Sequence, residues 1–350
     1  MTRLVLIHGR DQGGLEPDGI EDRWIDALNA GLAASGSTLR LTDDDATFVY
    51  YGDTLAALDD GSDTGAVDPA PPVTVHAFDA GSPTTHRLLA DEARFALAVV
   101  HEILIAAEIS PDAQADDVHA PPAGPAPTDP APTDPAPATA ARPSAALDGS
   151  ALDGSALDGS ALAVALARAL AALDRYVPGL SGAVVLLALR DVYTYLHDDE
   201  ARAAVDAGVL AALATDEPAV VVAHSLGSVI AYQVLRSQEA GGLDVPLLVT
   251  LGSPLAIRAV REAVTAIAPP GWPAPVDRWV AVRDPRDLLS LHDLTPRTFP
   301  LEPPGPGVEN TRVDNPVPGH HAAAAQADGV TAGYAATPEV GSLLDAALAP

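Results

Sequence analysis

The chain has 350 residues, enough to bury the core of one large α/β domain or of two smaller ones. It contains neither Cys nor Lys, and all 19 of its basic residues are Arg. Disulfides, thiolate nucleophiles, Schiff bases and a P-loop lysine are therefore excluded. The formal net charge of -29 argues against binding to nucleic acid or to an anionic membrane surface.

The N-terminus runs directly into a strand pattern, with no long apolar leader and no small-residue cleavage site. No window of the sequence reaches the roughly 18 consecutive apolar residues that a membrane span needs. We therefore expect a cytoplasmic protein without a transmembrane segment. The sequence leaves its oligomeric state open.

The first part of the chain has the pattern of an α/β unit. Apolar periodicity predicts, in chain order, a strand at residues 4–7, a helix at 21–34 and a strand at 47–51. Residues 61–83 are rich in Pro, Gly and Asp, and the sheet pattern ends there. A long apolar helix is predicted over 88–109. We interpret residues 54–110 as a lid-like helical insertion.

Residues 111–160 have a low-complexity composition rich in Pro, Ala and Gly. A doubled A-P-T-D-P unit covers 126–135, and a tripled A-L-D-G-S unit covers 146–160. A period of five fits neither helix nor strand, and the prolines block regular backbone pairing. We therefore expect a disordered linker inside a single domain that spans residues 1–350.

Strands and helices alternate through the rest of the chain. The predicted elements are helices at 162–176, 199–213, 255–267 and 338–348, an apolar segment at 183–196, and strands at 219–223, 246–251, 278–282 and 308–313. This alternation, with short connections, predicts an α/β fold whose mostly parallel central sheet carries helices on both faces.

The segment A-H-S-L-G, residues 223–227, places Ser225 between a buried-strand pattern and a helix pattern. Small residues two positions before and after a serine let the strand and the helix pass close together. This is the strained nucleophile elbow, whose usual form is G-x-S-x-G, with Ala223 here in place of the first Gly. A serine nucleophile needs a base, and without Lys or Cys that base must be His. Ser225 is our candidate nucleophile.

Two aspartates directly follow the strand predicted at 278–282. Loops at the carboxyl ends of parallel strands face the ligand crevice, so either aspartate is placed to orient a catalytic histidine. We favour Asp287, because Pro285 sets up a turn that carries it past the end of the strand. Asp284 is the alternative, and its position also suits a cap or an ion pair with Arg286.

Two adjacent histidines, His320 and His321, follow the last predicted strand, and only one of them can point inward. We slightly favour His321 as the base, because it leads into a run of alanines, and keep His320 as the alternative. His224 is expected to project away from Ser225 and to pack in the core. No pair of histidines has metal-ligand spacing near a carboxylate cluster, so we expect no metal and no cofactor.

An acyl-transfer site also needs donors for the developing oxyanion. One is the backbone amide of Leu226, at the positive end of the predicted helix. The other is expected from the loop after the first strand, at Gly9 or Arg10.

Together these pieces resemble the α/β-hydrolase superfamily, and within it bacterial lipase-like or esterase-like serine hydrolases. The matching segments are V-L-I-H-G-R (5–10), V-Y-Y-G-D (49–53), A-H-S-L-G-S (223–228), L-G-S-P-L (251–255), D-P-R-D (284–287) and G-H-H (319–321). The resemblance implies a triad of Ser225, Asp287 and His321, in the chain order of that superfamily. It also implies an oxyanion hole at Leu226 and at Gly9 or Arg10.

The activity that this resemblance implies is cleavage of a small-molecule or lipid-like carboxylic ester through an acyl-serine intermediate. The same triad would also serve a peptidase or an acyltransferase. A non-catalytic binding module on the same fold is a further alternative.

Overall fold

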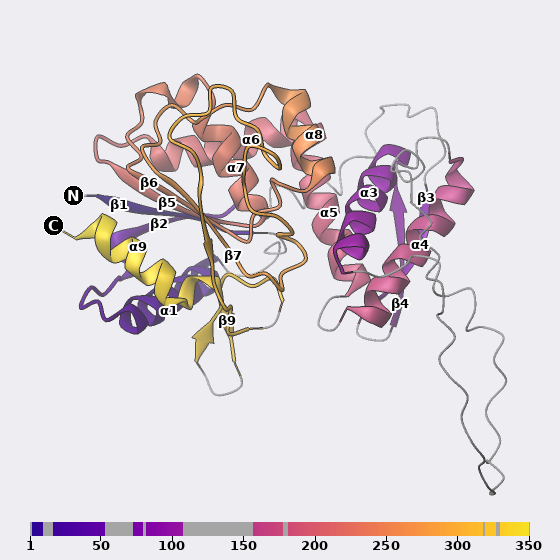
Figure 1. The fold of residues 1–350 in the computed structure, drawn as a ribbon, viewed down its shortest axis with the longest axis horizontal. Coiled ribbons are helices and arrows are strands. Elements are labelled where there is room, and N and C mark those ends of the chain that lie inside the picture. The colour runs from indigo at the N-terminus through magenta and orange to yellow at the C-terminus, as the bar shows by residue number, and fades with distance from the viewer. Residues whose placement is uncertain are drawn as a thin grey trace, which may run out of the picture.

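A computed structural model describes residues 2–9, 17–52, 73–79, 82–107, 157–177, 181–317, 319–326 and 330–349. Within these ranges the centre of the fold is a six-stranded sheet in which every pairing is parallel (Figure 1). In sheet order its strands are β2 (Ala46–Val49), β1 (Arg3–Ile7), β5 (Ala219–His224), β6 (Leu247–Leu251), β7 (Trp279–Arg283) and β8 (Glu309–Arg312). The predicted α/β class with a mostly parallel central sheet is confirmed.

Strand order reverses between β1 and β5. From β1 the chain first adds β2 on one side and later β5 on the other, which makes their boundary a topological switch point. Ile7 pairs with Ala223, so the loop after β1 begins beside the end of β5. All six residues of β5 are buried, as expected for an apolar strand covered on both faces. The candidate elbow therefore lies where doubly wound sheets bind ligands.

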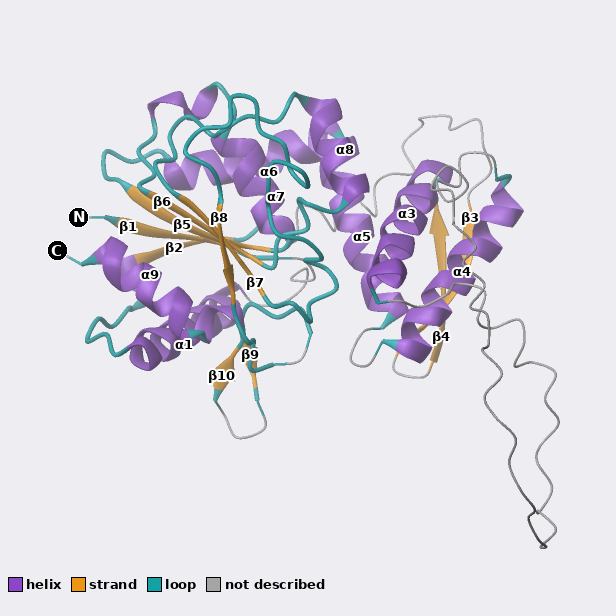
Figure 2. Ribbon diagram, viewed as in Figure 1, coloured by secondary structure: helices purple, strands orange, loops and turns teal. Residues whose placement is uncertain are grey.

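Helices cover both faces of the sheet (Figures 1 and 2). On one face lie α1 (Pro17–Ser35) and α9 (Pro338–Leu348), which pack against each other. On the other lie α6 (Asp199–Leu213), α7 (Leu226–Leu235) and α8 (Arg258–Ile267). None of the helices within the described ranges combines the length and the apolar character that crossing a bilayer requires.

A second group of elements, here called the insertion, lies to one side of the sheet beyond α8 (Figure 1). It consists of β3 (Val73–Asp79), β4 (Ser82–Leu88), α3 (Ala90–Ala106), α4 (Gly159–Tyr176) and α5 (Gly182–His197). The strands β3 and β4 form an antiparallel hairpin. α4 packs on α3 and β3, and both α3 and α5 contact α8. Buried side chains of the insertion belong to the same hydrophobic cluster as Ile7 and Ala223 of the sheet.

The insertion differs from the prediction in two ways. The hairpin was not predicted, because Pro, Gly and Asp dominate residues 61–83, although Val73 and Val75 are buried and Thr74 between them is exposed. The insertion also continues past residue 110, since α4 and α5 cover α3. The apolar segment predicted at 183–196 is a helix, α5.

The predicted linker, residues 111–160, lies outside the described residues up to position 156. Its last residues are described, and they start a helix. Asp158 is the N-cap of α4, and its Oδ1 accepts hydrogen bonds from the amides of Ser160 (3.0 Å) and Ala161 (2.9 Å). The third A-L-D-G-S unit therefore supplies a helix start, which its five-residue period conceals.

Four short elements were also missing from the prediction. They are the paired strands β9 (Ala324–Ala325) and β10 (Thr331–Ala332), and the 3-10 turns η1 (Asp43–Asp45) and η5 (Tyr334–Ala336). A further 3-10 turn, η4 (Glu239–Gly242), follows α7. Elements of two to four residues are too short to show a periodic pattern.

The close crossing of α1 and α9 depends on a glycine. A Cβ added to Gly341 would lie 2.1 Å from the carbonyl oxygen of Gly31, whereas one added to the exposed Gly208 in α6 would meet nothing within 4 Å. We therefore expect Gly341→Ala to lower the free energy of unfolding by about 2 kcal/mol or more. The matched change Gly208→Ala should raise it by about 0.5 to 1 kcal/mol. Urea unfolding of both variants measures this difference, and equal effects would contradict it.

Candidate active site

Ser225 occupies a strained turn between β5 and α7. Its backbone angles are φ 52° and ψ -123°, and among the described residues no other non-glycine has a positive φ. Such a conformation costs about 1 to 3 kcal/mol and persists only where the surroundings impose it. The Ser225 amide donates to the carbonyl of Leu251 (3.0 Å), and its own carbonyl accepts from the amide (2.9 Å) and the hydroxyl (2.5 Å) of Ser228. The fold thus holds a serine at a sharp strand-to-helix turn.

Gly227 makes this turn possible. A Cβ at Gly227 would lie 2.2 Å from the carbonyl oxygen of His8 and 2.5 Å from that of Ile7. Only a glycine lets the first turn of α7 pass so close to the end of β1. The small residue two positions after Ser225 is therefore explained by contact, as the motif predicts.

Asp287, which is buried, forms a hydrogen bond with the partly buried His320. His320 Nδ1 lies 2.6 Å from Asp287 Oδ2. Burial would raise the pKa of Asp287, but His320, the hydroxyl of Tyr334 and the amide of Leu289 hold it below its usual range. The other nitrogen of His320, Nε2, is buried and has no hydrogen-bond partner among the described residues. This imidazole is oriented on one side and free on the side that a hydroxyl would use.

The turn of Ser225 and the Asp287–His320 pair lie close together at the carboxyl ends of the strands. The Ser225 amide is hydrogen-bonded to the carbonyl of Leu251. Gly252, which follows Leu251, packs against Asp287 and His320. A Cβ at Gly252 would lie 2.9 Å from His320 Cε1 and 3.2 Å from Asp287 Oδ2. The imidazole of His224, which precedes Ser225, has its ring centroid 4.7 Å from that of His320. The neighbours of Ser225 in sequence and in space thus both contact the histidine.

The favoured histidine of the sequence analysis, His321, does not make the bond to Asp287. The alternative, His320, makes it, while His321 is exposed to solvent. The carbonyl of His321 accepts from the amide of Tyr334 (3.0 Å), which fixes the direction of this loop. His321 thus lies near the Asp287–His320 pair, but the histidine bonded to the carboxylate is His320.

The two aspartates have different partners. Asp284 pairs with the guanidinium of Arg286 (2.6 Å) and accepts from the amide of Asn315 (2.7 Å), whereas Asp287 turns toward His320. The amide of Asp287 donates to the carbonyl of Asp284 (3.0 Å), so one tight turn separates the two roles. Asp284 has the capping and pairing position that the sequence suggested for it.

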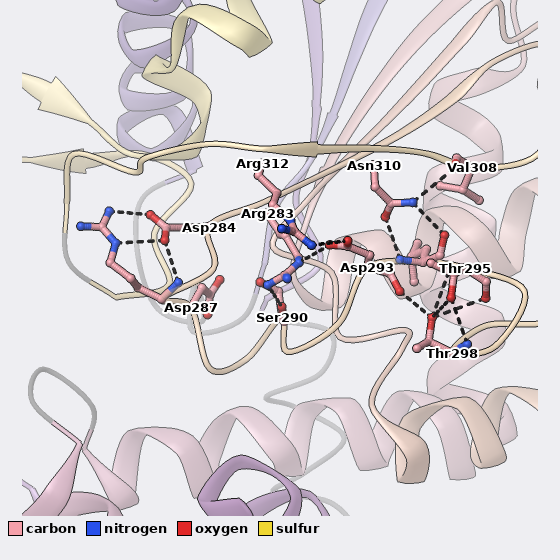
Figure 3. Close-up of polar contacts among 12 residues, drawn as sticks. Arg283, Asp284, Asp287, Ser290, Asp293, Thr295, Thr298, Val308, Asn310 and Arg312 are labelled. Atoms are coloured by element: carbon pink, nitrogen blue, oxygen red, sulfur yellow. Dashed lines mark hydrogen bonds and ion pairs between the residues drawn. The ribbon is translucent and has the colours of Figure 1, made fainter. Parts of the chain in front are cut away.

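An ionic and polar network fixes the loop that carries Asp287 (Figure 3). Asp293 accepts from Arg283 of β7 (2.5 Å) and from Arg312 of β8 (2.8 Å). Further along, Asn310 of β8 is bonded to both the amide (2.7 Å) and the carbonyl (2.9 Å) of Leu294. Two neighbouring strands therefore hold one loop, and the position of Asp287 does not depend on a single contact.

Two backbone segments flank Ser225 as possible oxyanion donors. Leu226 is the first residue of α7, where amides have no partner within the helix and the helix dipole favours negative charge. Gly9 lies directly beside Ser225, since a Cβ added there would be 3.1 Å from Ser225 Cβ and 2.6 Å from His224 Nδ1. The other candidate, Arg10, lies outside the described residues.

Tyr51 holds the loop of Gly9 in place, which the sequence analysis missed. Its hydroxyl donates to the carbonyls of His8 (2.5 Å) and Gly9 (3.2 Å), and its amide donates to His8 Nε2 (3.2 Å). The rings of His8 and Tyr51 stack with centroids 4.0 Å apart. In the sequence, the signal for this residue is the V-Y-Y-G-D segment (49–53), which resembles the α/β-hydrolase pattern but does not indicate what the tyrosine binds.

Two buried histidines near Ser225, His8 and His224, have lowered pKa values that favour the neutral imidazole. Burial lowers the pKa of His8 to about 4, although its hydrogen bond to the Gly9 carbonyl acts in the opposite direction. Burial also lowers the pKa of His224 well below its usual range, and the nearby histidines add to this effect. His224 lies beside Trp24 and Tyr334 as well as His320, which agrees with the packing role expected from the sequence.

Within the part of the chain that the structure describes, no cluster of three or more His, Cys, Asp or Glu side chains could hold a metal ion. Comparison of the chain with protein-family models, with curated proteins and with solved structures gave no match.

The neutral His8 makes stability depend on pH. The unfolded chain protonates this residue near pH 6.5 and the folded protein only near pH 4, so the unfolded state binds more protons between these values. Stability should therefore fall as the pH falls through this window, with His8 contributing about 2 kcal/mol of loss between pH 7.5 and 5. Urea unfolding at both pH values measures the loss. His8→Gln should reduce it, and an unchanged loss in that variant would show that His8 is not its source.

Proposed function

We propose that the protein is a serine hydrolase that cleaves carboxylic esters through an acyl-serine intermediate. The observation that carries this proposal is the arrangement at the sheet edge. Ser225, in a strained turn, lies at the same ends of the strands as His320. One nitrogen of His320 is bonded to the buried carboxylate of Asp287, and the other has no hydrogen-bond partner among the described residues. This is the set of roles that nucleophilic acyl transfer requires.

The chemistry follows from these positions. His320 Nε2 takes the proton of the Ser225 hydroxyl as Oγ attacks the carbonyl carbon of the ester, giving a tetrahedral oxyanion. The collapse of this oxyanion breaks the ester C–O bond, and the imidazolium gives its proton to the leaving alkoxide. His320 then deprotonates a water that attacks the acyl-serine, and the acid leaves as the serine regains its proton. Asp287 stabilises the imidazolium in both halves of the reaction.

The oxyanion would be stabilised by backbone amides. The amide of Leu226 is fixed at the start of α7, and the loop of Gly9 is fixed by Tyr51. Donors held in place before the reaction are worth about 3 to 4 kcal/mol each in comparable sites. These two segments correspond to the donors of α/β-hydrolases, which are the residue after the nucleophile and the loop after the first core strand.

The chain order Ser225, Asp287, His320 is also that of the α/β-hydrolase superfamily, and this supports membership in it. The insertion fits the same proposal. It leaves the sheet after β2, directly beyond Tyr51, and returns at α6 before β5. It therefore connects to the sheet at the edge that holds the site, where a lid over a small ester or lipid-like substrate would lie.

Replacing Ser225 by Ala tests the nucleophile. Hydrolysis of a p-nitrophenyl ester should fall by about a million-fold in kcat, because the acyl-enzyme can no longer form. Labelling by a serine-directed fluorophosphonate should disappear as well. Ser342→Ala, on the exposed side of α9, is the matched control and should retain both activities. Full labelling of the Ser225→Ala variant would exclude Ser225 as the nucleophile, and a folded parent protein that resists the probe would point to a binding module.

The two histidines can be separated by a matched pair of variants. We expect His320→Gln to lower the fluorophosphonate labelling rate by about 10⁴-fold, because the base is lost. His321→Gln should change the rate by less than about two-fold, because the exposed imidazole does not contact Asp287. Labelling reactions at pH 7.5, quenched at a series of times, measure both rates. The opposite pattern would restore His321 as the base.

A further inference from the structure

We propose that Tyr334 is a positioning residue that shares the acceptor oxygen of Asp287 with His320 and thereby sets how strongly Asp287 binds the imidazole. This inference deepens the proposed function and rests on it for its catalytic meaning. The Tyr334 hydroxyl lies 2.6 Å from Asp287 Oδ2, and His320 Nδ1 lies 2.6 Å from the same oxygen. The side chain of Tyr334 is fully buried.

The proton of the Tyr334 hydroxyl has a fixed direction. The amide of Asp284 donates to the hydroxyl oxygen at 2.9 Å, so this oxygen is an acceptor on that side. Its own proton is therefore directed to Asp287, which as a carboxylate can only accept. Burial and the neighbouring Asp287 raise the pKa of Tyr334 well above its usual range, so it stays a neutral donor.

The backbone of Tyr334 also holds the histidine loop. Its amide donates to the carbonyl of His321 (3.0 Å). Before it, Gly333 has φ 141°, and a Cβ there would lie 2.3 Å from the carbonyl oxygen of Ala322. Only a glycine suits this position, because the backbone at Gly333 lies directly against the loop that carries His320. One residue thus fixes both members of the Asp287–His320 pair.

Sharing one oxygen weakens each bond to it. Asp287 Oδ2 receives two donors, and Oδ1 receives the amide of Leu289 (2.9 Å). Without the Tyr334 hydroxyl, Asp287 would be a stronger acceptor for His320 and would favour the imidazolium. The other titratable groups facing the pair are His224, which burial keeps neutral, and His321. The nearby Arg286 is bonded to Asp284 and Asp314 instead.

The test compares Tyr334→Phe with a chemically matched variant, Tyr195→Phe. Tyr195 is also fully buried and also donates to an aspartate, Asp206 (2.7 Å), but in α5 and α6. The readout is the fluorophosphonate labelling rate of Ser225 between pH 4 and 9. In Tyr334→Phe the midpoint of the acid limb should move to higher pH by about half a pH unit, and the maximal rate should fall about ten-fold. Tyr195→Phe should show the parent midpoint. An unchanged midpoint in Tyr334→Phe would reduce Tyr334 to a structural role and overturn the inference.

A second measurement does not depend on activity. The Nδ1 proton of His320, assigned by its absence in His320→Gln, should resonate at low field in the proton NMR spectrum because its acceptor is charged. In the parent protein it should show an NOE to the hydroxyl proton of Tyr334, and in Tyr334→Phe it should move further downfield. The absence of that NOE would overturn the inference even if Tyr334→Phe fails to fold. Failure of the proposed function is seen separately, as a parent protein that the probe does not label.

Discussion

The site depends on the close approach of α7 to the end of β1, which Gly227 alone permits. A side chain at that position would collide with the carbonyls of Ile7 and His8 and push the helix away from the strand. The elbow angle of Ser225 and the placement of Gly9 beside it both follow from this approach. The other bonds at this edge, to Leu251 and from Ser228, hold a conformation that would otherwise relax. The close contact at Gly227 and these hydrogen bonds together hold Ser225 in its strained conformation.

Much of this could be predicted from the sequence, because the responsible signals are local. The run of valines before Ser225 indicates a strand buried on both faces, and the helical spacing after Gly227 indicates the turn. Helices such as α6 and α9 were predicted with the bounds that the structure has, because their apolar residues repeat at helical spacing over the whole helix. The position of Asp287 beyond the end of β7 also followed from local rules, since a parallel strand has a defined exit direction.

The rest could not be predicted, because it depends on contacts between distant segments. His320, rather than the favoured His321, bonds to Asp287. The loop that carries both histidines is held by the hydrogen bond from the Tyr334 amide to the His321 carbonyl, beside a small hairpin with no periodic signal. Tyr51 and Tyr334 are single residues whose hydroxyls find partners only after folding. The β3–β4 hairpin lies in a segment whose composition suggests a loop, and its cover comes from α4, beyond the low-complexity run. Composition describes a segment but not what will pack on it.

The cap of α4 has a consequence for how this gene can change. Asp158 belongs to the last of three identical A-L-D-G-S units, so the residues that begin the helix are present in each copy. If replication slippage removed one unit, the preceding aspartate would take the same place before the same Gly-Ser-Ala-Leu sequence. The helix would keep a capping interaction worth about 1 kcal/mol. Shortening a connection by five residues changes the entropy of closing it by only a small fraction of that energy. Loss of one unit should therefore leave the start of α4 and its cap unchanged.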